Sequence, residues 1–426
     1  MNEIILVEGK IDFNVIEKKI FNNNSLVVSF DFDSHKTLNQ NKIKHKLVED
    51  YFSEEDKIEI DSFSLKLGTS WYKNEKISQY LEYDKINLGS LLELEMPSYF
   101  LKILKRVIGI KKIVEKEEPK KIISYSLKKY VNEFCKKKEI TIKNYEKRKE
   151  TGLFFDEISI PLSLGVTTKN IKISRKNYFR LKKIMEKISN SIWRTKLNKK
   201  LLLNNESILL IDFNTKLYED LLKSFPVSNK NIIILNQRKP AIWNLETLQI
   251  IKNSNCKILS IKDFENKITK EKNELDQKEF NKKLKKMLND KNSLNAIFSH
   301  NQESFWEIIE NEFSDIITKR FSESIKRLVL IDIMFNEMNI KSVLDWAHTG
   351  MEEKEISFLA NKRKIPIFCL QHGIMTLNPK FNKYHSIMPV LPSNNSKMLV
   401  WGEIMKDYLL KQNVNSKDIT IVGSPR

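Results

Sequence analysis

Short runs of isoleucine, valine and leucine recur along this chain and alternate with segments whose apolar residues follow helical spacing. Continuous apolar runs of this kind are typical of parallel strands covered on both faces, because crossover helices pack on either side of the sheet. The pattern therefore predicts an α/β protein with Rossmann-like parallel sheets flanked by helices. The predicted strands are Ile4–Val7, Leu26–Phe30, Lys121–Tyr125, Ile140–Ile142, Ile208–Phe213, Ile232–Leu235, Lys257–Ser260, Ser342–Trp346, Pro366–Leu370, Met398–Trp401 and Ile419–Val422.

The chain has 426 residues, which is enough for two or three domains of ordinary size. The polar stretch YEKRKETG places one boundary near residue 150, and the pattern changes again near residue 204. We therefore expect an amino-terminal Rossmann-like domain over 1–150, a helical connector or insertion over 151–204, and a second Rossmann-like domain over 205–426. The span 262–338, which begins with the lysine- and glutamate-rich stretch Lys262–Lys291, is predicted to be a helical excursion from that second domain.

Three segments have the periodicity of helices. Arg175–Leu203 is basic and amphipathic, and His300–Met338 is predicted to be one long helix or a broken pair. Ser98–Lys116 has an apolar side opposite a basic one, so it either packs on a sheet or lies on an anionic membrane surface. In the second segment, the residues expected in the core are Trp306, Ile309, Phe313, Ile316, Ile317 and Phe321.

The net charge and the cysteines bear on the partners of the protein and on its cellular compartment. The net charge of +19 either attracts phosphate-bearing partners or reflects lysines on solvated helix faces. The cysteines Cys135, Cys256 and Cys369 lie far apart, without metal-ligand spacing and without the numbers of a disulfide framework. The amino terminus lacks the regions of a signal peptide, and no apolar run approaches the roughly 18 residues of a membrane span. A cytoplasmic protein is expected.

The first two strands end in carboxylates, Glu8 after one and Asp31 and Asp33 after the next. A Glu followed by an Asp-x-Asp pair resembles the Toprim signature, in which these groups hold magnesium. A Toprim arrangement needs two helices and two further strands between Glu8 and Asp31, but the interval has room only for one helix, Phe13–Phe21, and one strand. The spacing therefore favours the β-α-β start of a Rossmann-like domain, with these carboxylates as strand-end residues.

The carboxy-terminal part carries a more specific set of strand ends. Successive predicted strands end in AHTG, QHG, WG and GSPR. Because parallel strands end at the same edge of a sheet, His348 and His372 can converge on one cleft. Glycines at such positions let the backbone turn or approach a ligand closely; they are Gly350, Gly373, Gly402 and Gly423.

This ordered set resembles the GT-B glycosyltransferases and their relatives in surface-polysaccharide biosynthesis, including the glycerophosphotransferases of teichoic-acid synthesis. The non-hydrolysing sugar-nucleotide 2-epimerases are similar in plan. The resemblance covers roughly residues 207–426 and implies that His372 is the general base for an acceptor hydroxyl. The substrate-binding residues that it implies are His348, Gln371, Gly373, Gly402, Gly423, Ser424 and Arg426.

The resemblance implies transfer of a sugar or polyol phosphate from a nucleotide-activated donor to a glycan or lipid-linked acceptor. No metal and no cofactor are expected, because the GT-B plan stabilises the diphosphate with a helix dipole and basic side chains. The expected partners are the donor and the acceptor. An anionic membrane surface, at the inner face of the membrane, stays open as a further partner. Nucleic acid is not expected as a partner. Two alternatives remain, a sugar-nucleotide 2-epimerase and a basic nucleic-acid-binding or Toprim-like module.

In GT-B proteins a nucleotide-binding domain follows the strand that ends in a GSPR-like sequence. The sequence here ends at Arg426, directly after that strand. The resemblance therefore predicts the acceptor-side part of a longer protein, inactive as residues 1–426 alone, and whether this chain is itself an enzyme stays open.

Overall fold

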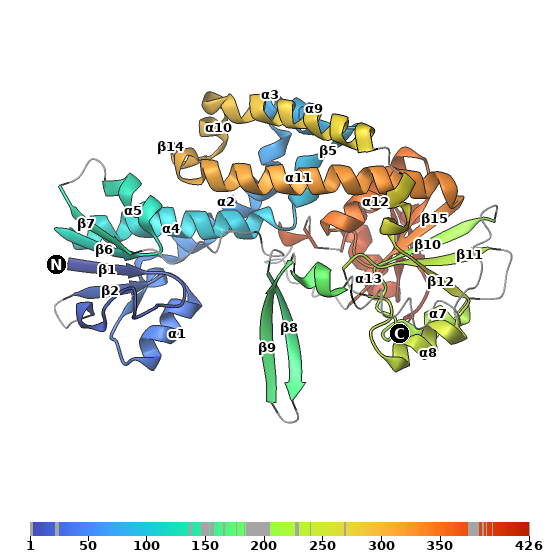
Figure 1. Cartoon of the computed structure of the whole chain (residues 1–426), viewed down its shortest axis with the longest axis horizontal. Coiled ribbons are helices and arrows are strands. Elements are labelled where there is room, and N and C mark those ends of the chain that lie inside the picture. Colours follow the sequence, from blue (N-terminus) through green and yellow to red (C-terminus); the bar gives the residue numbers. More distant parts are fainter. Residues whose placement is uncertain are drawn as a thin grey trace. The chain divides into compact units, whose positions relative to one another are not determined.

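The computed structural model describes residues 3–21, 25–135, 139–145, 153, 157–164, 167–175, 177–182, 184, 205–225, 230–238, 240–267, 270–373, 383–385, 387–388, 390–393 and 395–425 (Figure 1). The chain divides into two compact units, each assembled from separate stretches of sequence. Unit 1 comprises Met1–Asn74, Glu95–Phe154 and Leu288–Ile316, and unit 2 comprises Glu75–Leu94, Phe155–Met287 and Ile317–Arg426. The boundaries predicted near residues 150 and 204 both lie outside the described residues.

Unit 1 contains a five-stranded parallel sheet with the strand order β3-β2-β1-β6-β7. Its strands are β1 (Glu3–Val7), β2 (Leu26–Ser29), β3 (Lys46–Leu47), β6 (Lys121–Tyr125) and β7 (Thr141–Tyr145). The segment predicted as a helix, Phe13–Phe21, is not one: among its residues only Lys18–Ile20 form a 3-10 turn. The sheet is nevertheless parallel, as predicted for a Rossmann-like domain.

Helices cover the sheet of unit 1, and two of them pack closely on each other. The helices are α1 (Phe32–Gln40), α2 (Glu54–Ser70), α4 (Met96–Glu117), α5 (Lys128–Cys135) and α10 (Lys291–Ile297), followed by the hairpin β13 (Ser299–His300) and β14 (Glu303–Ser304). A Cβ atom on Gly68 of α2 would lie 2.5 Å from the backbone nitrogen of Pro97, so α2 and α4 approach closely. Ile103, Leu104 and Ile110 of α4 are completely buried. The segment predicted as Ser98–Lys116 is therefore a helix whose apolar face packs in the protein interior.

Unit 2 contains a seven-stranded parallel sheet with the order β12-β11-β10-β15-β16-β17-β18. Its strands are β10 (Ser207–Ile211), β11 (Asn231–Leu235), β12 (Cys256–Leu259), β15 (Ile340–Asp345), β16 (Ile367–Leu370), β17 (Lys397–Val400) and β18 (Ile419–Ile421). The apolar runs alone predicted every one of these strands, with small shifts at their ends. The fold class predicted from the sequence is therefore confirmed.

The remaining elements are helices and short hairpins. The helices are α3 (Glu75–Ser78), α7 (Glu219–Ser224), α8 (Leu245–Asn253), α9 (Lys270–Asn289), α11 (Trp306–Glu337), α12 (Met351–Lys362) and α13 (Glu403–Lys411). The hairpins are β4 (Glu82–Tyr83) with β5 (Ile86–Asn87), and β8 (Glu157–Leu164) with β9 (Thr167–Ser174). α7 and α8 pack below β10 and β11 in Figure 1, where Leu222 and Leu248 join a core with Leu210 and Ile234.

Two helix predictions can be compared with the structure. The predicted His300–Met338 segment forms the single continuous helix α11 after the β13–β14 hairpin, and its six predicted core residues are all buried. Of the predicted helix Arg175–Leu203, residues 175, 177–182 and 184 are helical, and the rest lies outside the described residues. No helix among the described residues combines the length and the apolar character that crossing a membrane requires.

Candidate functional site

The carboxyl edge of the seven-stranded sheet is where this type of fold binds ligands, because the chain connections reverse direction between β10 and β15. Segments that follow β10, β11 and β15 line a cavity of about 250 Å³ at this edge. Its lining residues are Asp212, Phe213, Asn214, Thr215, Leu217, Tyr218, Asn236, Arg238, Pro240, Ala241, Trp243, Thr247 and Trp346. The lining thus combines four aromatic residues with polar and charged ones, and small-molecule sites also combine apolar walls with polar groups.

A second hollow, of about 820 Å³, lies at the opposite edge of the same sheet. It is lined by residues that precede β15 and β16, among them Asn339, Arg363 and Pro366. Ligands of parallel α/β sheets bind at the carboxyl edge, so we place the candidate site at the smaller cavity.

Asp212 is the central polar residue of the cavity. It follows β10 in a left-handed conformation, with φ of 52°. The backbone N–H groups of Gln237 and Arg238 donate to its Oδ1 at 2.7 and 2.8 Å, and the indole N–H of Trp346 donates to its carbonyl oxygen at 2.8 Å. Burial raises the pKa of Asp212 to about 6, although the backbone hydrogen bond from Arg238 works against this rise. Its other carboxylate oxygen, Oδ2, is buried and has no hydrogen-bond partner among the described residues.

Asn236 supplies a second acceptor to the cavity. Its side-chain N–H donates to the carbonyl of Phe213 at 2.9 Å, which leaves its buried Oδ1 without a partner among the described residues. The turn that carries Asn236 is held in place by Lys182, whose ammonium group donates to the carbonyls of Asn236 and Gln237 at 2.9 and 2.8 Å. The positions of both unpartnered oxygens are thus fixed by neighbouring backbone, and both belong to residues that line the cavity.

Arg238 connects the cavity to a buried cluster of charges at the start of α12. Its guanidinium donates to Glu353 at 2.5 Å, and Arg175 pairs with Glu352. Burial by itself would raise the pKa of Glu352, but the positive charges of Arg175, Arg327 and Arg238 lower it to about 2. Carboxylates in the first turn of a helix also face the positive end of its dipole. Glu352 is therefore ionised at neutral pH and holds the surrounding guanidinium groups in place.

The two histidines predicted for the site lie near this cavity in different environments. His372 packs on Trp346, with their ring centroids 5.8 Å apart, so one side chain separates it from the cavity. His348 is only 2% exposed, and its ring nitrogens lie 2.9 Å from the sulfur of Cys369 and 2.7 Å from the carbonyl oxygen of Leu391. Burial lowers the pKa of His348 to about 4, so its imidazole is neutral at neutral pH.

The other predicted site residues lie along the same sheet edge. The amide of Gln371 is engaged within the protein: it donates to the carbonyl of Gly373 at 2.9 Å and accepts from the backbone N–H of Trp401 at 2.8 Å. Gly402 caps α13, and Gly423 has φ of 78°. Ser424 is exposed, and Arg426 lies outside the described residues.

Sequence reasoning did not single out Asp212 and Asn236 as site residues. Asp212 was placed inside the predicted strand Ile208–Phe213, and Asn236 directly follows another predicted strand. A carboxylate within an otherwise continuous apolar run was the available signal for Asp212, because a buried carboxylate requires partners.

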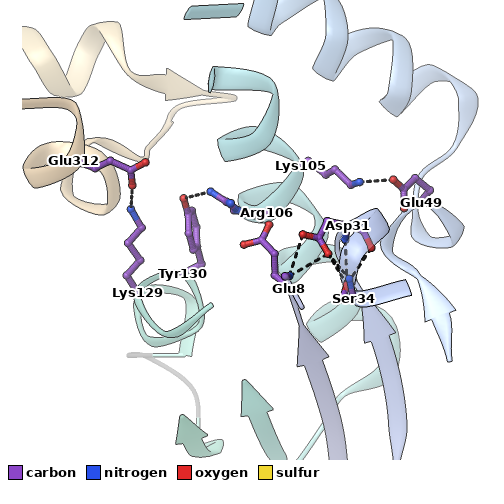
Figure 2. A network of polar contacts seen from close by, with 10 residues as sticks. Glu8, Asp31, Ser34, Glu49, Lys105, Arg106, Lys129, Tyr130 and Glu312 are labelled. Carbon is purple, nitrogen blue, oxygen red and sulfur yellow. Dashed lines mark hydrogen bonds and ion pairs between the residues drawn. The ribbon is translucent and has the colours of Figure 1, made fainter. Parts of the chain in front are cut away.

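The carboxylates that resemble a Toprim motif lie at the corresponding edge of unit 1 (Figure 2). Glu8 accepts from Nε of Arg106 at 2.8 Å, and Arg106 also donates to the hydroxyl of Tyr130 at 3.0 Å. Asp31 caps α1 by accepting from the backbone N–H of Ser34 at 2.8 Å, and it accepts from the N–H of Gly9 at 3.0 Å. Protein donors thus satisfy both carboxylates, which follow the adjacent strands β1 and β2 as the spacing predicted.

We expect Glu8→Gln to lower the free energy of unfolding by about 2 kcal/mol, because Arg106 then loses its charged hydrogen-bond partner in a largely buried site. Urea unfolding measures this change. Glu49→Gln is the control, since its ion pair with Lys105 is more exposed and should contribute less than about 1 kcal/mol. Unchanged stability together with a loss of magnesium binding in Glu8→Gln would contradict the structural role and favour a Toprim-like site.

No protein-family model and no curated protein sequence matches the chain. Among solved structures, the chain is similar to UDP-GlcNAc 2-epimerase from Neisseria meningitidis bound to UDP-GlcNAc, with 13% sequence identity and a TM-score of 0.28. That similarity covers 52% of this chain and 47% of the epimerase chain, so the match spans about half of each protein.

Proposed function

We propose that this protein binds a nucleotide-activated sugar or polyol phosphate at the carboxyl edge of the seven-stranded sheet and takes part in its transfer to a glycan or lipid-linked acceptor. Surface-polysaccharide biosynthesis is the setting that the sequence resemblance implies. The observation that carries the proposal is the aromatic-walled cavity at the switch point, where Asp212 and Asn236 each retain a buried oxygen without a partner among the described residues.

The cavity fits one ring of such a donor. Its volume of about 250 Å³ is below the roughly 300–1,000 Å³ typical of pockets for drug-sized ligands. A sugar or base offers an apolar face to aromatic rings such as Trp243 and Trp346, and its hydroxyl or N–H groups can donate to the oxygens of Asp212 and Asn236. A ligand that donates hydrogen bonds would thus satisfy the oxygens that the protein leaves unpaired.

Arg238 supplies the positive charge that a phosphate requires. Its side chain lines the cavity and is 33% exposed, so it can meet an anion while it stays paired with Glu353. A guanidinium group binds phosphate oxygens through charge-assisted hydrogen bonds with fixed geometry. The phosphate part of the donor would therefore extend from the cavity toward Arg238.

His372 is our proposed general base. In the transfer step the acceptor hydroxyl oxygen attacks the anomeric carbon, or the phosphorus of a polyol donor, as the bond to the nucleotide leaving group breaks. The hydroxyl proton passes to the imidazole of His372. Its contact with Trp346, which lines the cavity, supports this assignment. His372→Ala is expected to abolish transfer in the full-length protein of which this chain is expected to be a part, while donor binding is retained.

Titration calorimetry with a panel of uridine- and cytidine-diphosphate sugars and polyols tests the binding step. Trp243→Ala should weaken binding of the best donor about tenfold, because stacking on an aromatic ring contributes roughly 1–3 kcal/mol. Leu245→Ala is the matched control: this residue is 68% exposed and does not line the cavity.

Two outcomes would contradict the proposal. If no donor of the panel binds with a Kd below about 1 mM, the cavity is not a donor site. If a bound nucleotide-sugar is converted in the absence of any acceptor, the reaction is that of a 2-epimerase rather than a transferase.

A further inference from the structure

Asp345, His348 and Cys369 form a buried cluster outside the cavity. Asp345 ends β15 and is paired in register with Cys369 on the neighbouring strand β16. His348 follows three residues after Asp345, and its Nδ1 lies 2.9 Å from Cys369 Sγ and 4.0 Å from Asp345 Oδ1. One ligand atom from each residue lies within 4.8 Å of the other two. Parallel pairing and a short turn therefore bring a carboxylate, an imidazole and a thiol together.

The imidazole of His348 is oriented for metal binding. Its Nε2 lies 2.7 Å from the carbonyl oxygen of Leu391, and because a carbonyl only accepts hydrogen bonds, Nε2 must carry the proton. In the neutral ring, Nδ1 then has a free lone pair, which faces Cys369 and Asp345. Metal-binding histidines almost always donate their second ring N–H in this way.

Asp345 has the greatest need for a partner. It is completely buried, and no N–H or O–H group of the described residues donates to either carboxylate oxygen; only the Cys369 thiol, a weak donor, faces the carboxylate. Burying a carboxylate without compensation costs several kcal/mol, and such groups normally pair or coordinate a metal.

We propose that Asp345, His348 and Cys369 bind a divalent transition metal of the Zn²⁺ class. Thiolate, imidazole and carboxylate are the ligands that Zn²⁺ takes in proteins. Nδ1, Sγ and one oxygen of Asp345 provide three donor atoms, and the second oxygen of the same carboxylate can make a longer, bidentate contact with the ion. Because Zn²⁺ has no geometric preference from d-electrons, it accepts such a mixed set.

The observed separations fit this coordination after small shifts. Ligand distances of about 2.0–2.3 Å at tetrahedral angles place donor atoms about 3.6 Å apart. The 2.9 Å separation of Nδ1 and Sγ would widen and the 4.0 Å separation of Nδ1 and Oδ1 would shorten. The charges also balance: the thiol releases one proton on binding, Asp345 releases one if protonated, and the two anions neutralise the ion.

The metal site does not depend on the proposed function. All three ligands are at most 2% exposed, and none of them lines the cavity. A bound ion would link the ends of β15 and β16 and fix the segment of His348 between β15 and α12. The role that we infer is therefore structural, and it assigns His348 to the metal rather than to the substrate.

Metal content and cobalt substitution of the whole chain test the site. After treatment with a chelator and addition of Zn²⁺ or Co²⁺, we expect one tightly bound ion per chain and, with Co²⁺, the near-ultraviolet absorption of a cobalt–thiolate bond. Cys369→Ser and Asp345→Asn should each weaken binding by more than about 100-fold, since even changes to groups that only orient the ligands cost 10–100-fold.

Controls separate this site from other metal binding. Cys256→Ser removes another buried cysteine of unit 2 and should leave binding unchanged. His45→Gln disrupts the His35–His45 pair, whose rings meet at 2.8 Å and could bind an ion elsewhere. Binding that survives in Cys369→Ser, or that is lost in His45→Gln, would overturn the proposal. If Cys369→Ser does not fold, the absence of a cobalt–thiolate band in the unmodified protein would do the same.

Discussion

Gly350→Ala is expected to lower the free energy of unfolding by about 4 kcal/mol, because it breaks a buried ion pair. Gly350 caps α12, and a Cβ atom at this position would lie 1.4 Å from Nη2 of Arg238 and 2.3 Å from Oε2 of Glu353. The guanidinium would have to leave its place, and Glu353, which is 1% exposed, would lose its partner. Removing one partner from a buried pair typically costs about 3–5 kcal/mol.

Gly402→Ala is a matched control, since Gly402 caps α13 in the same way but a Cβ atom there would meet nothing within 4 Å. Its expected cost is a few tenths of a kcal/mol, the ordinary difference between Gly and Ala at a helix N-cap. Urea unfolding of both variants measures the contrast. Equal, small effects would mean that Arg238 can leave Glu353 without penalty, and the charge cluster at the cavity would then not be rigid.

The same glycine shows what the sequence could and could not predict. Apolar runs placed the strands, because burial on both faces requires continuous hydrophobic sequence. Since all strands of a parallel sheet end at one edge, the sequence also placed Gly350, His348 and His372 near a common site. The sequence could not predict why position 350 requires a glycine. The guanidinium of Arg238 occupies the space beside it, and Arg238 follows a different strand.

The proposed metal ligands illustrate a second limit. The three cysteines lie far apart along the chain, and their spacing alone indicates no metal site. The neighbours of Cys369 in the cluster are an aspartate and a histidine three residues apart, and only the β15–β16 register brings them to this cysteine. Register depends on tertiary packing. Sequence spacing can therefore indicate the aspartate and the histidine as a pair of ligands, but it cannot identify the cysteine that joins them.

The division of the chain into two units also could not be predicted from the sequence pattern. Residues 75–94 complete unit 2, and residues 288–316 complete unit 1, although each lies among stretches of the other unit. Such exchanges depend on which apolar faces meet in three dimensions. Phe313 is recognisable from the sequence as a core residue, but not as one that packs, together with Phe298, on Phe100 of α4.

Glu352→Gln should lower stability by about 3 kcal/mol at neutral pH, and this difference should shrink in acid. The folded-state pKa of Glu352 is about 2 against an ordinary value of 4.5, because three arginines hold it ionised. A depressed carboxyl pKa contributes stability above the unfolded value of 4.5 and loses it as pH falls through 2. Each pKa unit corresponds to about 1.4 kcal/mol, which gives about 3 kcal/mol above pH 5 and about 2 kcal/mol at pH 3.5.

Urea unfolding at pH 7, 5 and 3.5 measures the difference between the two proteins. Glu403→Gln is the control, because Glu403 occupies the first turn of α13 but is 69% exposed, and its pair with Lys406 should contribute less than about 1 kcal/mol at any of these pH values. Burial raises the pKa of Glu353, and the charge of Glu352 adds to this rise, so removal of that charge eases the ionisation of Glu353 and offsets part of the loss. A difference that stays constant from pH 7 to pH 3.5 would contradict the depressed pKa. It would mean that Glu352 acts through packing rather than through its charge, and the guanidinium of Arg238 would then not depend on this carboxylate for its place beside the cavity.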